Sequence, residues 1–182
     1  AGTGEIGDAG DEGPAFDAQF GYISGLTVGP DGSIYVGDYK MHRIRRITPD
    51  GTIHAYAGTG EWGADGNGGS ALDAKVKMPV GIAVGPDGTV YFSDQLDHTV
   101  RRITPDGTIH AFAGTSEPGF SGDGGPATEA QLNYPMGIAV ASDGSVFIVD
   151  QDNHRIRRVT ADGMMTTVAG DGVGRFRGDG DP

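Results

Sequence analysis

The chain has 182 residues, 13 basic and 25 acidic side chains, and a formal net charge of -12. This acidity argues against a general nucleic-acid binder, which needs clustered Lys and Arg unopposed by acids. Cysteine is absent, so disulfides and thiolate chemistry are excluded. The 34 glycines and 10 prolines recur at fixed places between apolar runs, and they predict turns in an all-β fold.

An internal repeat of 56 residues runs through the whole chain without insertion or deletion. Its clearest marker is the tetrapeptide Ala-Gly-Thr-Gly, or a close variant, which starts at residues 1, 57, 113 and 169. The same offset relates the Asp-Gly pairs that start at residues 31, 87 and 143. A fixed period of this kind is typical of repeat architectures, so the sequence predicts three copies of one structural unit.

Each unit is predicted to contain four short strands. In the second copy the strands cover residues 81–84, 89–93, 99–104 and 108–113. Turns at 85–88 and 105–107 join them through Pro-Asp-Gly, which offers a preset φ, a capping side chain and a residue that tolerates positive φ. Two tight turns between β-rich segments predict a meander of successive hairpins.

The strands are apolar on both faces, as in residues 145–149, so each sheet is expected to be covered on both sides. Stacked propeller blades meet that requirement. We predict one propeller module over residues 1–182, with blades at 22–58, 78–114 and 134–170. Glycine-rich connectors occupy residues 1–21, 59–77 and 115–133, and a short helical turn is expected after Pro126.

The repeat resembles the NHL-repeat family of β-propellers. The resemblance rests on Gly-Ile-Ala-Val at 81–84, Asp-Gly at 87–88, and Asp-Gln-Asp-Asn-His-Arg-Ile-Arg-Arg at 150–158. The connector at 120–128 is similar to a long-repeat variety common in bacterial proteins and to part of the teneurin propeller. The resemblance covers the whole chain. It implies binding platforms, sensor domains and, in relatives, enzymes, so it does not name one function.

The family's usual ring has six blades, so three blades imply closure by a second copy as a homodimer. An open half-ring exposes two apolar blade faces, which favours self-association. Residues 171–182 repeat residues 3–14, which gives each junction of a dimer two connectors for one slot. We expect the C-terminal copy to be displaced or disordered there. The start without Met indicates a processed, excised or engineered product.

Both Asp-Gly turns of a meander blade are expected at one face of the ring, with the loop after the second strand at the other. That loop face is the candidate site for a ligand, either a protein or a small molecule. Its recurring polar residues are Asp38, His42, Asp94, His98, Asp150 and His154. The alternative is that each Asp caps its own loop and each His satisfies backbone groups. Recurrence in every blade favours this architectural role.

A second recurring set is the arginines Arg46, Arg102 and Arg158, which we expect to link neighbouring blades to the loop aspartates. Replacing Arg102 with Ala should then lower the thermal stability. RNA binding needs a continuous basic face, and it could be proposed for the repeated arginines Arg43, Arg45, Arg46, Arg101, Arg102, Arg155, Arg157 and Arg158. Strand alternation and the net acidity oppose such a patch, so neither nucleic acid nor membrane is expected as a partner.

No catalytic residue, metal ligand or cofactor is predicted. The connectors lack the alternating carboxylates of a calcium loop, although calcium remains an alternative there. A second alternative is an enzyme of the six-bladed lactonase or lyase type, but the inner strand entries are mostly apolar. We therefore expect a non-catalytic structural or binding scaffold that assembles with itself. There is no signal peptide or membrane span in the sequence, and the localisation stays open.

Overall fold

The computed structural model describes residues 1–174, which form three antiparallel sheets. The strands of the first sheet are β1 (Gly13–Pro14), β2 (Ile23–Val28), β3 (Ile34–Asp38), β4 (Arg43–Ile47) and β5 (Thr52–Ala57). The second sheet holds β6 (Pro79–Val84), β7 (Val90–Asp94), β8 (Thr99–Ile103) and β9 (Ile109–Ala113). The third holds β10 (Pro135–Val140), β11 (Val146–Asp150), β12 (Arg155–Val159) and β13 (Met165–Ala169). The predicted all-β fold with four-stranded antiparallel units is confirmed.

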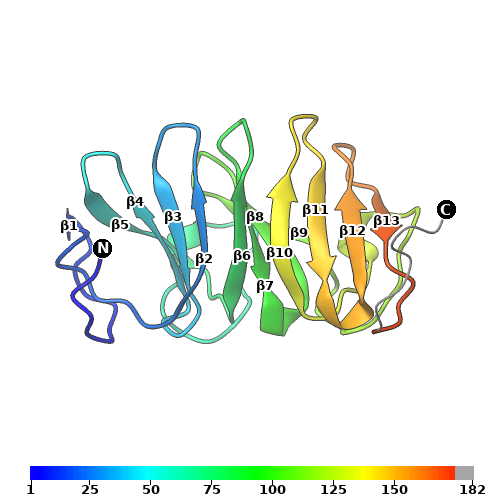
Figure 1. Ribbon diagram of the computed structural model, residues 1–182, viewed down its shortest axis with the longest axis horizontal. Helices are drawn as coiled ribbons and strands as arrows, with labels where there is room; N and C mark the ends of the chain where they lie inside the picture. Colours follow the sequence, from blue (N-terminus) through cyan, green and yellow to red (C-terminus); the bar gives the residue numbers. More distant parts are fainter. Residues whose placement is uncertain (175–182) are drawn as a thin grey trace.

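The three sheets stand side by side as blades, with their inner strands β2, β6 and β10 next to one another (Figure 1). Strands β1 and β13 lie at opposite ends of this row. We call the sheets blade 1, blade 2 and blade 3 in chain order. Only blade 2 has a neighbour on both sides within the described part of the chain.

The hairpin turns of all three blades gather at one end of the strands, at the top of Figure 1. In the β6–β7 turn, Gly88 has φ +84° and donates its amide to Gly85 O at 3.0 Å. The Asp87 carboxylate accepts the Thr89 amide at 3.0 Å and closes the turn. This is the turn chemistry that Pro-Asp-Gly predicts. The loops from β3 to β4 and their equivalents therefore lie at the opposite end, which is the loop face.

The second and third connectors each run along the outer strands of two consecutive blades. The second connector accepts the Gly58 amide at Ala71 O, 3.0 Å away, just after β5. Two residues earlier in the connector, Gly69 O accepts the Ile109 amide of β9 at 2.9 Å. Its short 3-10 turn, η1 (Ala71–Asp73), begins at the first of these contacts, and η3 (Ala127–Glu129) is the equivalent turn of the third connector. The turns η2 (Gln95–Asp97) and η4 (Gln151–Asn153) belong to the loop face.

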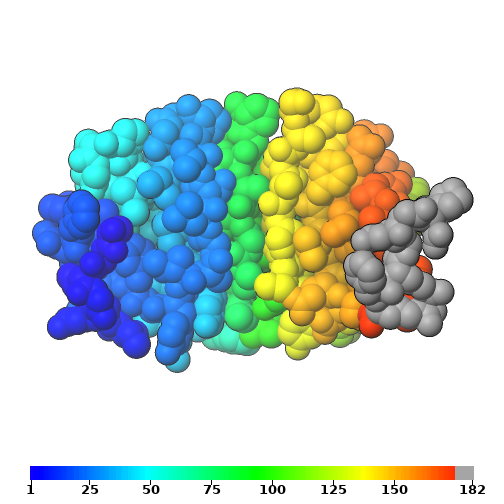
Figure 2. Space-filling model, viewed as in Figure 1, coloured from blue at the N-terminus to red at the C-terminus, as the bar shows by residue number. Residues whose placement is uncertain are grey.

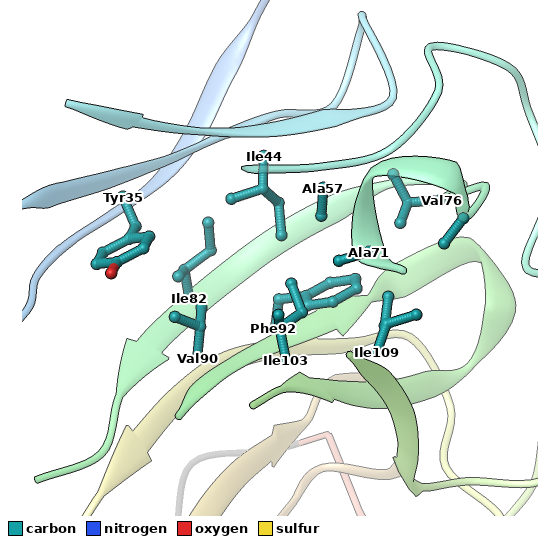
Figure 3. Packing of buried hydrophobic residues seen from close by; sticks show 11 residues of the cluster. Tyr35, Ile44, Ala57, Ala71, Val76, Ile82, Val90, Phe92, Ile103 and Ile109 are labelled. Carbon is teal, nitrogen blue, oxygen red and sulfur yellow. The ribbon is translucent and has the colours of Figure 1, made fainter. Parts of the chain in front are cut away.

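The hydrophobic core lies between blades, not inside them. At the first junction blade 1 and the connector supply Tyr35, Ile44, Ala57, Ala71 and Val76 (Figure 3). These side chains pack against one face of blade 2, which consists of Ile82, Val90, Phe92, Ile103 and Ile109. A second cluster of the same kind joins blades 2 and 3. Burial of apolar area contributes roughly 25 cal/mol per Å². Each blade is therefore stabilised mainly by its neighbours.

The predicted displacement of the C-terminal connector copy concerns residues that lie mostly outside the described range, which ends at residue 174. The N-terminal copy is packed on blade 1, where β1 pairs with β5. Within residues 1–174, none of the helical turns has the length and apolar character needed to cross a membrane.

Candidate functional site

The loop-face aspartates end the second strand of each blade and hold the segment that enters the first strand. The Asp94 carboxylate is fully buried and accepts the Lys77 amide at 3.0 Å and the Met78 amide at 2.8 Å. Asp38 accepts the amides of Gly21 and Tyr22 in the same way. These carboxylates are used by the fold, but Asp94 makes no cap hydrogen bond to its own loop, so the expectation that each Asp caps its own loop does not hold there.

Asp150 makes the corresponding contact in blade 3, where its carboxylate accepts the Asn133 amide at 2.7 Å. It is also paired with Arg157 Nη1 at 3.2 Å, with both side chains fully buried. The third aspartate is therefore as fully engaged as the other two. The three carboxylates stay one blade apart and do not converge on a common centre.

Burial has a measurable consequence at Asp94. It raises the pKa of this carboxyl from 3.8 to about 6, although the amides of Met78 and Lys77 and the charge of Arg101 act in the opposite direction. A buried carboxylate pays a desolvation cost that hydrogen bonds offset only in part. Asp94 therefore remains ionised at neutral pH, where the desolvation of its carboxylate lowers the stability of the fold.

The loop-face histidines reach from one blade to the next. Nδ1 of His42 lies 2.6 Å from Lys77 O, so this nitrogen carries the proton and donates. Nδ1 of His98 accepts the Tyr134 amide at 3.2 Å, so the proton of this ring sits on Nε2. All three histidines hold left-handed backbone, with φ of 54°, 56° and 52° for His42, His98 and His154. Two of these side chains are thus blade-to-blade links.

The expected role of Arg46, Arg102 and Arg158 is wrong. Arg46 pairs with Asp31 at 2.6 Å and Arg158 with Asp143 at 3.3 Å, and both aspartates belong to the turn of the same blade. In the strand register Arg46 lies opposite Tyr35, close to the turn end of the sheet. The loop aspartates lie at the other end, so these arginines cannot reach them.

Arg102 differs from its two equivalents because residues 1–174 offer it no ion pair. Its guanidinium lies over the Phe112 ring at 5.9 Å from the centroid, and its Nε is buried without a hydrogen-bond partner in this part of the chain. The hydroxyl next to it, on Thr89, donates to Asp87 and accepts no bond from this arginine. In the other two blades a serine hydroxyl at this place accepts the arginine Nε.

The arginines that the sequence did not single out are the ones that fix the connectors. Arg45, Arg101 and Arg157 are fully buried. Arg101 donates to Asn67 Oδ1 at 3.0 Å, to Lys75 O at 2.7 Å and to Asp65 O at 2.9 Å. The signal was available as a pair of adjacent arginines between two apolar residues in every copy. Alternation alone did not reveal which face the connector covers.

The two end faces of the row are the most unusual surfaces of the molecule. The leading face of blade 1 consists of Leu26, Val28 and Ile34, with Leu26 63% and Val28 60% exposed. The trailing face of blade 3 consists of Phe147, Val149, Ile156, Val168 and Ala169, with Val168 48% exposed. The same positions of the two internal junctions are buried in the clusters described above. Large exposed apolar patches mark sites of association.

A cavity of about 230 Å³ opens on the trailing face. It is lined by Val149, Ile156, Ala169 and Gly170, with His154 and Arg155 at its loop-face side. By contrast, no group of three or more His, Asp or Glu side chains within the described residues is arranged to hold a metal ion. The geometry therefore directs attention to the end faces and their occupants.

Comparison with known proteins agrees with this architecture. A family model described as the teneurin NHL domain matches residues 113–175, and one described as the NHL repeat matches residues 20–47. Teneurin-m of Drosophila melanogaster is 35% identical over 160 residues, which cover 80% of this chain and 5% of that protein. Protein SUPPRESSOR OF QUENCHING 1, chloroplastic, of Arabidopsis thaliana is 28% identical over 150 residues, covering 78% of this chain and 14% of that protein.

Among solved structures, virginiamycin B lyase from Staphylococcus aureus is similar at a TM-score of 0.55 and 26% identity. The match covers 80% of this chain and 40% of the lyase chain. The chain thus spans only a small part of its curated relatives and less than half of this structural neighbour. Three four-stranded blades, the repeated sequence and these matches together identify the chain as a member of the NHL-repeat β-propeller family, similar to part of the teneurin NHL domain.

Proposed function

We propose that this chain is a non-catalytic binding scaffold that completes a propeller ring by associating with a second copy of itself. The observation that carries the proposal is the pair of end faces. The leading face of blade 1 repeats the face of blade 2 that packs on blade 1, and the trailing face of blade 3 repeats the face of blade 2 that packs on blade 3. Two copies supply six blades and bury all four end faces.

The backbone of the inner strands supports this pairing. A Cβ added at Gly25 would lie 2.0 Å from Val80 O, and one at Gly81 would lie 2.0 Å from Met136 O, so these glycines permit adjacent blades to approach closely. Gly137 occupies the same position in blade 3, where the nearest contact is the Val149 side chain. Gly137 therefore leaves room for the close approach of a further inner strand, which a second copy would supply.

The loop face supports the pairing as well. His42 and His98 each bond to the backbone that enters the next blade. His154 has the same left-handed backbone and lines the cavity of the trailing face. In a ring of two copies it meets the segment equivalent to Lys77, which is residue 21 of the second copy. The closed loop face then forms the continuous platform on which a protein or small-molecule ligand binds.

Light scattering over a range of concentrations tests this function. We expect a mass of twice 18.7 kDa at high concentration and dissociation on dilution. Replacing Leu26 with Asp should hold the chain at monomer mass, because the leading face would bury a charge. A matched control is Leu72→Asp, which alters a residue that is 51% exposed but lies on a connector. A wild-type monomer at every concentration contradicts the proposal, as does equal loss of dimer in both variants.

A second candidate function is lyase-type catalysis, which is favoured by the likeness to virginiamycin B lyase. On this hypothesis the inner strand entries at Tyr22, Met78 and Tyr134 face the substrate near the central axis. The scaffold hypothesis predicts no turnover of a streptogramin B antibiotic by the purified chain and no change of melting temperature with EDTA. Turnover that EDTA abolishes, together with a lower melting temperature, supports the lyase.

A further inference from the structure

The end of β5 runs into a slot of the connector that follows it. The Gly58 amide donates to Ala71 O and the Thr59 amide to Ala74 O, each at 3.0 Å. A Cβ added at Gly58 would lie 3.0 Å from a methyl group of Val76, so the Val76 side chain packs directly on this glycine. Two connector carbonyls and one apolar side chain thus receive the strand end at this junction between blades.

The first four residues of the chain fill the equivalent slot of the first connector. The Gly2 amide donates to Ala15 O at 2.8 Å, and the Thr3 amide donates to Ala18 O at 2.9 Å. A Cβ added at Gly2 would lie 3.2 Å from Cδ2 of Phe20, which takes the place of Val76. Residues 1–4 therefore reproduce the contacts of the internal junction.

The conformation is copied along with the contacts. Residues 1–4 and 57–60 have the same sequence, Ala-Gly-Thr-Gly. Gly2 and Gly58 both have φ +94°, and Gly4 and Gly60 both have φ +87°. These values lie in the left-handed region that favours glycine. Residues 1–4 thus imitate the end of an outer strand and lie on blade 1 beside the leading face.

The trailing end of the chain carries a genuine strand end of this kind. Gly170 follows β13 with φ +90° and lines the 230 Å³ cavity together with Ile156 and Ala169. At the internal junction the equivalent place is filled by Val76, which packs in one cluster with Ile44 and Ala57. The equivalent filler from a second copy is its Phe20, which is larger than Val76 and suits an open cavity.

We infer that residues 1–4 occupy the docking slot for residues 169–172 of a second copy, and that ring closure exchanges one segment for the other. The inference rests on the self-association proposed above. Ala15 O, Ala18 O and the surface of Phe20 form one binding place, and two strand ends cannot share it. Closure therefore releases residues 1–4 and inserts the strand end of the second copy, while its trailing face covers the leading face.

The exchange conserves hydrogen bonds, because two amides leave the connector carbonyls and two amides replace them. The gain comes from covering the two apolar end faces, which residues 1–4 do not reach. Residues 1–4 compete with the second copy for the slot. The apparent affinity of the dimer is therefore the intrinsic affinity multiplied by the fraction of molecules in which the slot is open. With two hydrogen bonds holding the segment, removal of residues 1–4 should tighten the dimer about tenfold.

The test compares dimer dissociation constants by sedimentation equilibrium for the full chain and for a variant that lacks residues 1–4. A matched pair of C-terminal truncations tests the role of residues 169–172, the segment that replaces residues 1–4. A chain that ends at Gly172 keeps the strand end and should dimerise like the full chain. A chain that ends at Val168 loses it and should dimerise at least tenfold more weakly, by the same count of hydrogen bonds.

Exchange of the Thr3 amide, followed by NMR, reports on the slot directly. We expect this amide to be protected in the monomer and to exchange freely in the dimer. Tighter association of the variant without residues 1–4 supports the inference. If removal of residues 1–4 leaves the dimer affinity unchanged and the Thr3 amide stays protected in the dimer, the exchange is overturned while the self-association stands. Monomers in every variant overturn both.

Discussion

Leu26 and Ile82 occupy the same register position in blades 1 and 2, yet their surroundings are opposite. Ile82 is 7% exposed and packs in the cluster between blades with Tyr35 and Ile44. Leu26 is 63% exposed on the leading face, which none of the three described blades covers. Figure 2 shows the surface of blade 1 in blue and cyan. The pattern of apolar residues is the same in both blades. The difference arises only from the presence of a neighbour.

This comparison shows that the repeat is built for a ring and not for independent stability. In repeat proteins the stability is approximately the sum of unit terms and nearest-neighbour interface terms. Blade 2 receives two interface terms, whereas blades 1 and 3 receive one each in the single chain. The partial cover of blade 1 comes from its own connector, through the cluster of Ala15, Ala18 and Ile53.

The largest predicted effect separates these two positions. Ile82→Ala removes a side chain from a closed core and should lower the free energy of unfolding by about 2–5 kcal/mol. Leu26→Ala changes an exposed side chain and should change it by no more than about 0.5 kcal/mol. Urea unfolding of the monomer at low protein concentration measures both. Similar losses in the two variants would show that the leading face is already covered.

The repeat, the strands and the turns could be predicted because each is encoded locally. Asp31 and Gly32 close the first turn as Asp87 and Gly88 close the second, with glycine φ of 80° and 84°. Positive φ at glycine and a carboxylate that caps the turn require no tertiary information. The loop face could be placed for the same reason, since the meander alternates the ends of its strands.

The arginine roles could not be predicted because they depend on the connector. Arg45 and Arg46 are adjacent in β4 and necessarily point to opposite faces of the blade. Arg45 bonds to Asp11 and to the carbonyls of Ala9 and Gln19, which belong to a segment without the alternating pattern of a strand. Only the folded path of that segment decides which of the two arginines becomes buried.

The second predicted effect uses the pH dependence of the middle blade. The pKa of Asp94 is raised to about 6 in the folded protein, above the value of 3.8 that applies to the unfolded chain. Its protonated form therefore stabilises the fold fully below pH 3.8, and this contribution is lost as the pH rises through 6. A shift of this size corresponds to about 3 kcal/mol.

Asp94→Asn removes this titration, so it isolates the contribution from the other carboxyls. The free energy of unfolding of the wild type relative to Asp94→Asn should fall by about 2 kcal/mol between pH 4 and pH 7. Urea unfolding at several pH values measures the difference. A difference that is constant with pH would mean that Asp94 is solvated, and that the middle blade is less tightly closed than blade packing indicates.

The smallest predicted effect compares Arg46 in blade 1 with Arg102 in blade 2. Arg46 is held by Asp31 and by the Ser33 hydroxyl, so Arg46→Leu should cost about 1 kcal/mol of stability. Arg102 keeps a buried Nε without a partner in the described chain, and an unsatisfied donor offsets what its ring contact contributes. Arg102→Leu should therefore leave the stability within about 0.5 kcal/mol of the wild type.

This order of the two variants reverses the sequence-based expectation that Arg102 supports the fold. A larger loss in Arg102→Leu than in Arg46→Leu, measured by thermal unfolding, would restore it and would show that the neighbours of blade 2 make its surface arginine structural.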